Sequence, residues 1–153
     1  MISANKLELH MVHPNAEKIW EYSGMWLMGG GLYCMLETFW QGFTHWTMFV
    51  AGGSLFLLIG LERGKAPCRW SLISQVVIGG LTITAGEFLI GCVLNLLLHL
   101  HVWDYSKEPY NLMGQISLFS SFIWYWLALF AILLFDTAHW LLFGGERPVD
   151  HLL

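Results

Sequence analysis

The chain has 153 residues, of which 56% are hydrophobic and only 12% are charged, and its formal net charge is −4. A soluble domain carries about 25% charged residues, so this composition excludes an ordinary soluble domain, and no basic surface for nucleic-acid recognition is visible. The three cysteines form no CxxC pair, so we do not expect a thiol–disulfide relay. We predict no metal site, no cofactor and no catalytic residue.

Four apolar segments follow one another along the chain, and such segments are typical of membrane-spanning helices. Residues 1–22 are polar and amphipathic, without a cleavable signal, and we expect an interfacial segment in which a helix starts again after Pro14-Asn15. The predicted fold is an all-α, polytopic membrane protein, a four-transmembrane-helix bundle formed by one membrane domain over residues 1–153. Its spans are expected at about 23–41, 46–61, 72–98 and 112–135, followed by a cytoplasmic tail at 136–153. Within this tail, residues 136–143 suit either an extension of the fourth helix or a helix on the membrane surface.

Basic residues predict the orientation of these spans. Six of the seven fall on one side of the membrane, and only Lys107, between the third and fourth spans, falls on the other. The positive-inside bias assigns the richer side to the cytoplasm. We therefore expect both termini in the cytoplasm and residues 99–111 outside.

Two glutamates lie inside predicted spans, where an ionisable group costs roughly 2.5–3.5 kcal/mol on insertion scales. Glu37 and Glu87 each follow a Gly-Gly pair by the same spacing, since Gly29-Gly30 and Gly79-Gly80 both precede six residues and a glutamate. This match indicates a parallel repeat of two helix hairpins, the kind of repeat that places binding sites at its interface in transporters.

Small and polar residues form a stripe at helical spacing on each glutamate-bearing span. Because lipid favours neither stripe, we expect both to point inward and to pack together. The stripe on the third span comprises Gly80, Thr84, Glu87, Gly91 and Asn95, and that on the first comprises Trp26, Gly30, Tyr33, Glu37 and Gln41.

The predicted outer segment between the last two spans contains a dense polar and aromatic motif. Asp104 can bond back onto nearby backbone or pair with Lys107, and Asn111 can cap the fourth helix. Pro109 forces its predecessor out of the helical region. The motif residues are Trp103, Asp104, Tyr105, Ser106, Pro109 and Asn111.

This motif, Trp-Asp-Tyr-Ser followed by Pro-aromatic-Asn-x-x-Gly-x-Ile, resembles the signature of the "putative ABC-transporter type IV" permease-like membrane proteins. The resemblance is best over Leu61–Trp126, and Glu87 and Glu37 match glutamates of that family. It implies an integral membrane location and a transport role. Because these proteins are mostly bacterial, a bacterial plasma membrane is expected.

Three functions stay open. A permease-like protein would bind or move a small molecule, lipid or proton through a site centred on Glu37 and Glu87, with cargo contacts from Asn95, Tyr33, Gln41 and Gln115. A structural or lipid-binding scaffold would use protonated, hydrogen-bonded glutamates between helices. An intramembrane acid–base enzyme, the less favoured alternative, would act on a lipid through the glutamates and Asp104, with His99 and His101 nearby.

The expected partners are membrane lipid and either further copies of the chain or a separate membrane or ATPase subunit. The sequence contains no phosphate-binding GxxxxGK[ST] motif, so an ATPase would be a separate chain.

Overall fold

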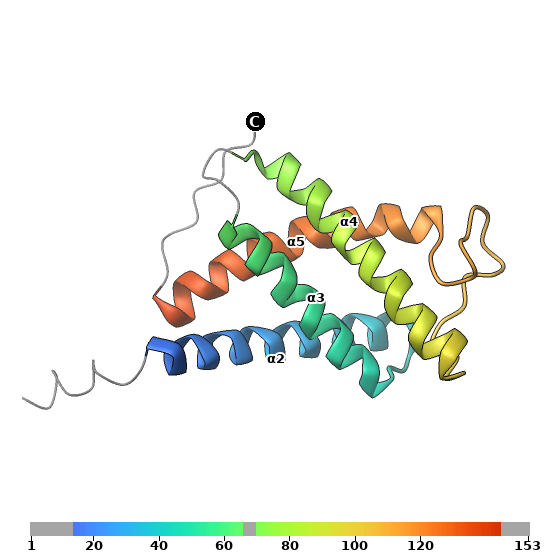
Figure 1. The fold of residues 1–153 in the computed structure, drawn as a ribbon, viewed down its shortest axis with the longest axis horizontal. Helices are drawn as coiled ribbons and strands as arrows, with labels where there is room; N and C mark the ends of the chain where they lie inside the picture. The colour runs from blue at the N-terminus through green and yellow to red at the C-terminus, as the bar shows by residue number, and fades with distance from the viewer. Residues whose placement is uncertain (1–13, 66–69, 145–153) are drawn as a thin grey trace, which may run out of the picture.

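Helices make up almost all of the described chain, which in this computed structural model comprises residues 14–65 and 70–144, with side chains for 17–62 and 70–144. The helices run alternately in opposite directions (Figure 1), and the described part contains no strand beyond an isolated bridge between Leu112 and Ile116. The all-α prediction is therefore confirmed for these residues. The elements are α2 (Pro14–Gln41), α3 (Trp46–Lys65), α4 (Leu72–Gly91), a π-helical turn η2 (Cys92–Leu97) that continues α4, and α5 (Leu118–Phe143).

The helix ends follow local capping chemistry. Helix α2 starts at Pro14, where a proline costs no hydrogen bond, so the expected interfacial segment from Pro14 onward and the first span form one continuous helix. Residues 1–13 of that segment lie outside the described residues. Helix α5 starts after Ser117, which forms a capping box with Ser120. The prediction that Asn111 caps this helix is therefore wrong, and residues 112–117 form a turn.

At its far end α5 continues to Phe143 and stops at Gly144, whose φ is +69°. Of the two alternatives for residues 136–143, the helix extension is therefore the observed one. The tail beyond Gly144 lies outside the described residues.

Glycines allow the helices of each consecutive pair to pack closely. A Cβ on Gly30 would lie 2.5 Å from the backbone oxygen of Phe49, so α2 packs tightly on α3, and one on Gly80 would lie 2.4 Å from the Tyr125 ring, so α4 packs on α5. The two Gly-Gly pairs thus occupy equivalent places in two helix hairpins.

Contrary to the prediction, the two polar stripes do not pack on one another. The α2 stripe lies against α3, where Gly52 contacts Tyr33 and Gly53 contacts Trp26. The α4 stripe instead faces α5 and the loop after η2. Helix α3 joins the two hairpins through contacts such as Gly60 against Phe135, and the core is centred there, on Met25, Phe56, Ile59, Ile83, Ala128, Ile132 and Phe135.

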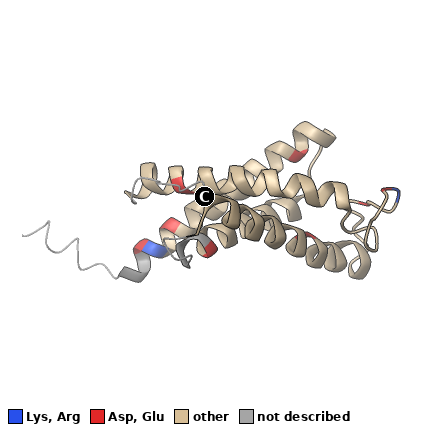
Figure 2. Ribbon diagram, turned by 90° about the horizontal axis from the view of Figure 1, so that it is seen from above, with Lys and Arg blue, Asp and Glu red and all other residues tan. Residues whose placement is uncertain are grey.

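Two of the described helices are long and apolar enough to cross a membrane: Leu72–Leu97 and Leu118–Phe143, each of 26 residues. In each, only 28% of the most apolar stretch is buried, whereas a core helix of a soluble protein is mostly buried. Few charged residues lie along the middle of the bundle (Figure 2). These two helices support a membrane location, while the expected four spans are not established by helix length and apolarity.

Candidate functional site

Glu87 is the central polar residue of the bundle. It lies on α4 with 8% of its surface exposed. Its Oε1 accepts a hydrogen bond from the Tyr105 hydroxyl at 3.0 Å, and its Oε2 accepts one from the indole N–H of Trp124 on α5. One carboxyl group therefore ties together α4, the loop that follows η2 and α5.

Tyr105 is held as a hydrogen-bond donor by its surroundings. Burial, and then the charge of the neighbouring Glu87 carboxylate, raise the pKa of the Tyr105 hydroxyl well above its ordinary value of about 10. The hydroxyl is therefore protonated at neutral pH. Its backbone N–H donates to the Gly114 carbonyl at 2.9 Å, which fixes where the ring enters the bundle.

Asp104 shapes the loop rather than the bundle interior. Its carboxylate accepts from the Ser106 backbone N–H at 2.8 Å and from the Ser106 hydroxyl at 3.0 Å. These two bonds lower the pKa of the Asp104 carboxyl below its usual range. The expectation that Asp104 bonds back onto nearby backbone is confirmed.

Asn111 and Glu108 close the rest of the loop. The Asn111 side chain donates to the Glu108 carbonyl at 2.7 Å and accepts from the Gly114 backbone N–H at 3.0 Å. The Glu108 carboxylate accepts from the hydroxyl of Ser117, which is 1% exposed. Pro109 lies exposed near the loop tip. The sequence motif thus serves mainly to fold the loop and to aim Tyr105 at Glu87.

A second polar cluster lies one helical turn beyond Gly91. Asn95 and Gln115 are each 4% exposed, and the Asn95 amide donates to Gln115 Oε1 at 2.9 Å while its oxygen accepts from Val102 N at 2.7 Å. The Trp103 indole donates to the Gln115 carbonyl at 2.9 Å. These bonds hold the loop against η2, and Gly91 leaves room for them because a Cβ there would lie 2.7 Å from Gln115 Oε1.

Two of the predicted site residues on α2, Glu37 and Gln41, lie apart from these clusters. Glu37, near the end of α2, accepts a hydrogen bond from Thr44 in the connection to α3, and Gln41 is exposed. In the described part of the chain no hydrogen bond joins Glu37 to Glu87. Tyr33 is close enough to both carboxyl groups to interact with them electrostatically.

Sequence reasoning missed the hydrogen-bond partners Trp124 of Glu87, Thr44 of Glu37 and Ser117 of Glu108. A tryptophan N–H in an apolar helix needs an acceptor when it is buried, which is the signal that could have led to Trp124.

His99 and His101 are exposed, with φ of 54° and 50°. The described residues contain no group of three His, Cys, Asp or Glu side chains that could hold a metal ion.

These features define a class of protein: an all-helical bundle with helices able to cross a membrane and with a structured loop locked onto a buried glutamate. Residues 41–143 match the model of the family described as "Putative ABC-transporter type IV". Since the match covers more than half of the chain, the protein belongs to this family, and the predicted resemblance is confirmed. No curated protein and no solved structure matches the chain.

Proposed function

We propose that this protein is a permease-like component of a membrane transport assembly, in which Glu87 is the centre of an intramembrane site for a small molecule, lipid or proton. The observation that supports this proposal most is the buried carboxyl of Glu87, held by donors from the outer loop and from α5. Ionisable residues at such depth commonly belong to ion and proton pathways. Tyr33 interacts electrostatically with this centre, Asn95 with its partner Gln115 lies about two helical turns beyond it, and Glu37 with Gln41 lies toward the end of α2.

The proposal includes four spans in one membrane domain, both termini in the cytoplasm and a bacterial plasma membrane as the location. The family's description as an ABC transporter favours a separate membrane or ATPase partner, or further copies of this chain, in contact with membrane lipid.

A scaffold role for Glu87 is the second candidate, and it has its own supporting observation. Both carboxyl oxygens accept hydrogen bonds from protein donors, so the group can serve purely to fasten the loop to the bundle. Polar contacts between helices in membranes contribute roughly 0.6 kcal/mol each.

Proton uptake into liposomes tests the first candidate against the second. The purified protein is reconstituted into vesicles loaded with a pH-sensitive dye, and uptake driven by an imposed pH difference is compared for the unsubstituted protein, Glu87→Gln and the exposed control Glu17→Gln. We expect uptake to be lost only in Glu87→Gln, with its thermal unfolding temperature close to that of the unsubstituted protein. Undiminished uptake by Glu87→Gln, or lower thermal stability as its sole defect, would favour the scaffold role.

A further inference from the structure

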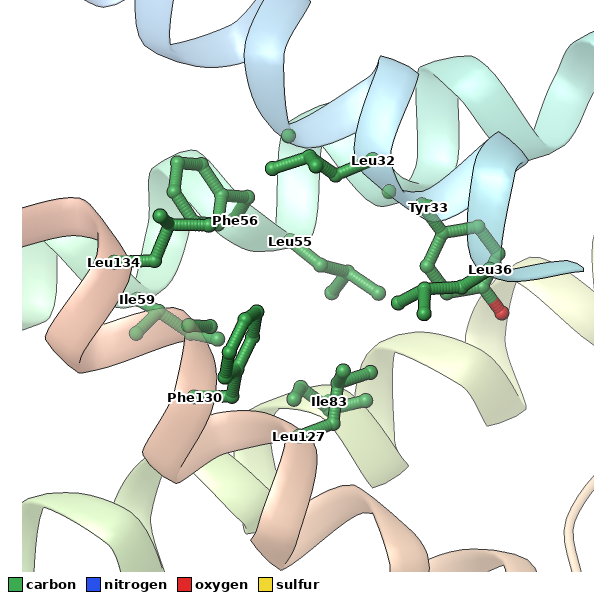
Figure 3. Close-up of a pocket in the computed structure, with 13 residues that line it drawn as sticks. Leu32, Tyr33, Leu36, Leu55, Phe56, Ile59, Ile83, Leu127, Phe130 and Leu134 are labelled. Carbon is green, nitrogen blue, oxygen red and sulfur yellow. The ribbon is translucent and has the colours of Figure 1, made fainter. Parts of the chain in front are cut away.

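An apolar pocket lies between the two helix hairpins, away from the polar clusters. Its volume is about 60 Å³, and all four described α-helices contribute to its wall. Figure 3 shows the side chains around it, among them Leu36 from α2, Ile59 from α3, Ile83 from α4 and Leu127 and Phe130 from α5.

The pocket follows from the way in which the helices pack. Helix α2 packs closely on α3 and α4 on α5, whereas α2 touches α5 only slightly. Gly29 and Gly52 also line the pocket and let α2 and α3 approach closely, because a Cβ on either would lie within 2.4 Å of the Phe56 or Tyr33 side chain. The gap lies where α2 faces the second hairpin, with which it makes few contacts.

The chemistry of the wall selects an apolar occupant. Tyr33 is the one polar side chain among the residues that line the pocket, and in Figure 3 its hydroxyl oxygen points away from the middle of the pocket. A cavity with such a lining stays dry and binds apolar groups. The volume is also far below the roughly 300–1,000 Å³ of sites for drug-sized molecules, so it fits a segment of a chain rather than a whole ligand.

The mouth of the pocket opens onto a surface that lipid would cover. Leu36 and Phe130, both in the pocket wall, are 50% and 59% exposed. Neighbouring outward residues on α5, such as Trp126 and Leu133, are also apolar and exposed at 64% and 42%. In a bilayer, the molecules next to this mouth are the hydrocarbon chains of lipids.

We propose that this pocket binds one acyl chain of a membrane lipid, inserted between the hairpins at the contact of α2 with α5. The chain supplies the dispersion contacts that the wall of an empty void would lack. Glu87 does not line this pocket, and the inference does not depend on Glu87 binding a ligand.

Photo-crosslinking tests this site directly. The full-length protein is reconstituted into phosphatidylethanolamine vesicles that contain a small fraction of the same lipid with a diazirine at the end of one acyl chain, and the labelled peptides are mapped by mass spectrometry. We expect labelling to concentrate on Leu32–Leu36 and Leu127–Leu134. Labelling spread evenly over all outward apolar helix faces would show surrounding lipid only and would overturn the proposal.

Two matched substitutions on α5 separate the pocket from general lipid contact. Leu127→Trp fills the pocket, whereas Leu141→Trp adds the same side chain at an exposed position of α5 that does not line it. We expect pocket labelling to fall severalfold only in Leu127→Trp. If Leu127→Trp does not fold, Leu36→Trp at the half-exposed mouth replaces it, and unchanged labelling in a folded pocket variant would contradict the proposal.

Exchange of the headgroup completes the test. Pocket labelling that persists with a diazirine-bearing phosphatidylglycerol supports recognition of the chain alone. Labelling that disappears on this exchange would overturn a site defined by the chain.

Discussion

At the scale of single residues, the bond between Tyr105 and Glu87 fastens the outer loop to the bundle. Tyr105→Phe removes the donor and leaves one buried oxygen of Glu87 without a partner. An unsatisfied buried polar group costs about 1–3 kcal/mol, so we expect the free energy of unfolding to fall by about that amount. Chemical unfolding of the purified protein in detergent measures it.

The chain offers a control for this substitution. Tyr110 lies in the same loop, is 83% exposed and takes part in no hydrogen bond through its hydroxyl in the described part of the chain. Tyr110→Phe should change the free energy of unfolding by less than about 0.5 kcal/mol. Equal effects of the two substitutions would mean that the Glu87 contact contributes nothing to stability.

Asp104 gives the loop a dependence on pH. Its pKa in the folded protein is lowered, first by the Ser106 backbone N–H and then by the Ser106 hydroxyl. A carboxyl with a lowered pKa stabilises the folded state above its unfolded pKa of about 3.9, and this contribution is lost as pH falls through the lower folded value. Hydrogen exchange of the Ser106 amide should therefore be slow at neutral pH and should accelerate, after correction for intrinsic rates, as pH falls below about 4.

Asp104→Asn provides the comparison for this titration. The variant should show less protection of Ser106 at neutral pH and no step in protection on acidification. A step of the same size in the variant would assign the pH dependence to another group.

The residues of the loop motif could be selected from the sequence, but most of their partners could not. Asp104 acts on a residue two positions away, so local chemistry predicts its bond. Glu87 bonds to Tyr105 and Trp124, which are 18 and 37 residues away. Such contacts depend on how the hairpins pack, and helical periodicity alone does not determine that packing.

At the scale of elements, the Gly-Gly pairs determine how closely the helices of a hairpin approach. Gly30 and Gly31 are adjacent on α2, yet a Cβ on Gly30 would meet a backbone oxygen at 2.5 Å while one on Gly31 would meet nothing within 4 Å. Gly30→Ala should therefore separate α2 from α3 and lower the free energy of unfolding by about 1–3 kcal/mol, the usual cost of overpacking.

Gly31→Ala is the matched control, because it makes the same chemical change one residue away. It should leave stability unchanged or raise it by up to about 1 kcal/mol, through the higher helix propensity of alanine. Thermal unfolding of both variants measures the difference, and equal losses would show that the α2–α3 contact does not depend on Gly30.

The boundaries of the helices could be predicted only where capping residues are unambiguous. Pro14 correctly indicated a helix start, and α2 ends at Gln41, where the first predicted span also ends. The start of α5 was placed too early because Leu112, Met113 and Ile116, which precede the helix, are apolar as well. Ser117, whose side chain accepts a hydrogen bond from the Ser120 backbone N–H, determines the actual start, and Asn111 already forms hydrogen bonds within the loop.

At the scale of the whole molecule, the two hairpins correspond to the repeated Gly-Gly-x6-Glu pattern, although the two glutamates do not form one pair. Each accepts a hydrogen bond from the connection within its own hairpin, Glu37 from Thr44 and Glu87 from Tyr105. The sequence repeat therefore predicted a similar place for each carboxyl within its hairpin. It did not predict how the hairpins join, because α3 makes that contact through Gly60 and Phe135.

The start of α2, which carries Lys18, and the loop between η2 and α5, which carries Lys107, lie at opposite ends of the bundle (Figure 1). In a version of the protein without its native cysteines, Lys107→Cys should react with a membrane-impermeant maleimide in intact cells. Lys18→Cys should react only after permeabilisation, because the positive-inside bias retains the basic N-terminal side in the cytoplasm. In the four-span orientation with cytoplasmic termini, the loop that carries Lys107 lies outside and Lys18 lies inside. Reaction of both positions in intact cells, or of Lys18→Cys alone, would therefore contradict this orientation.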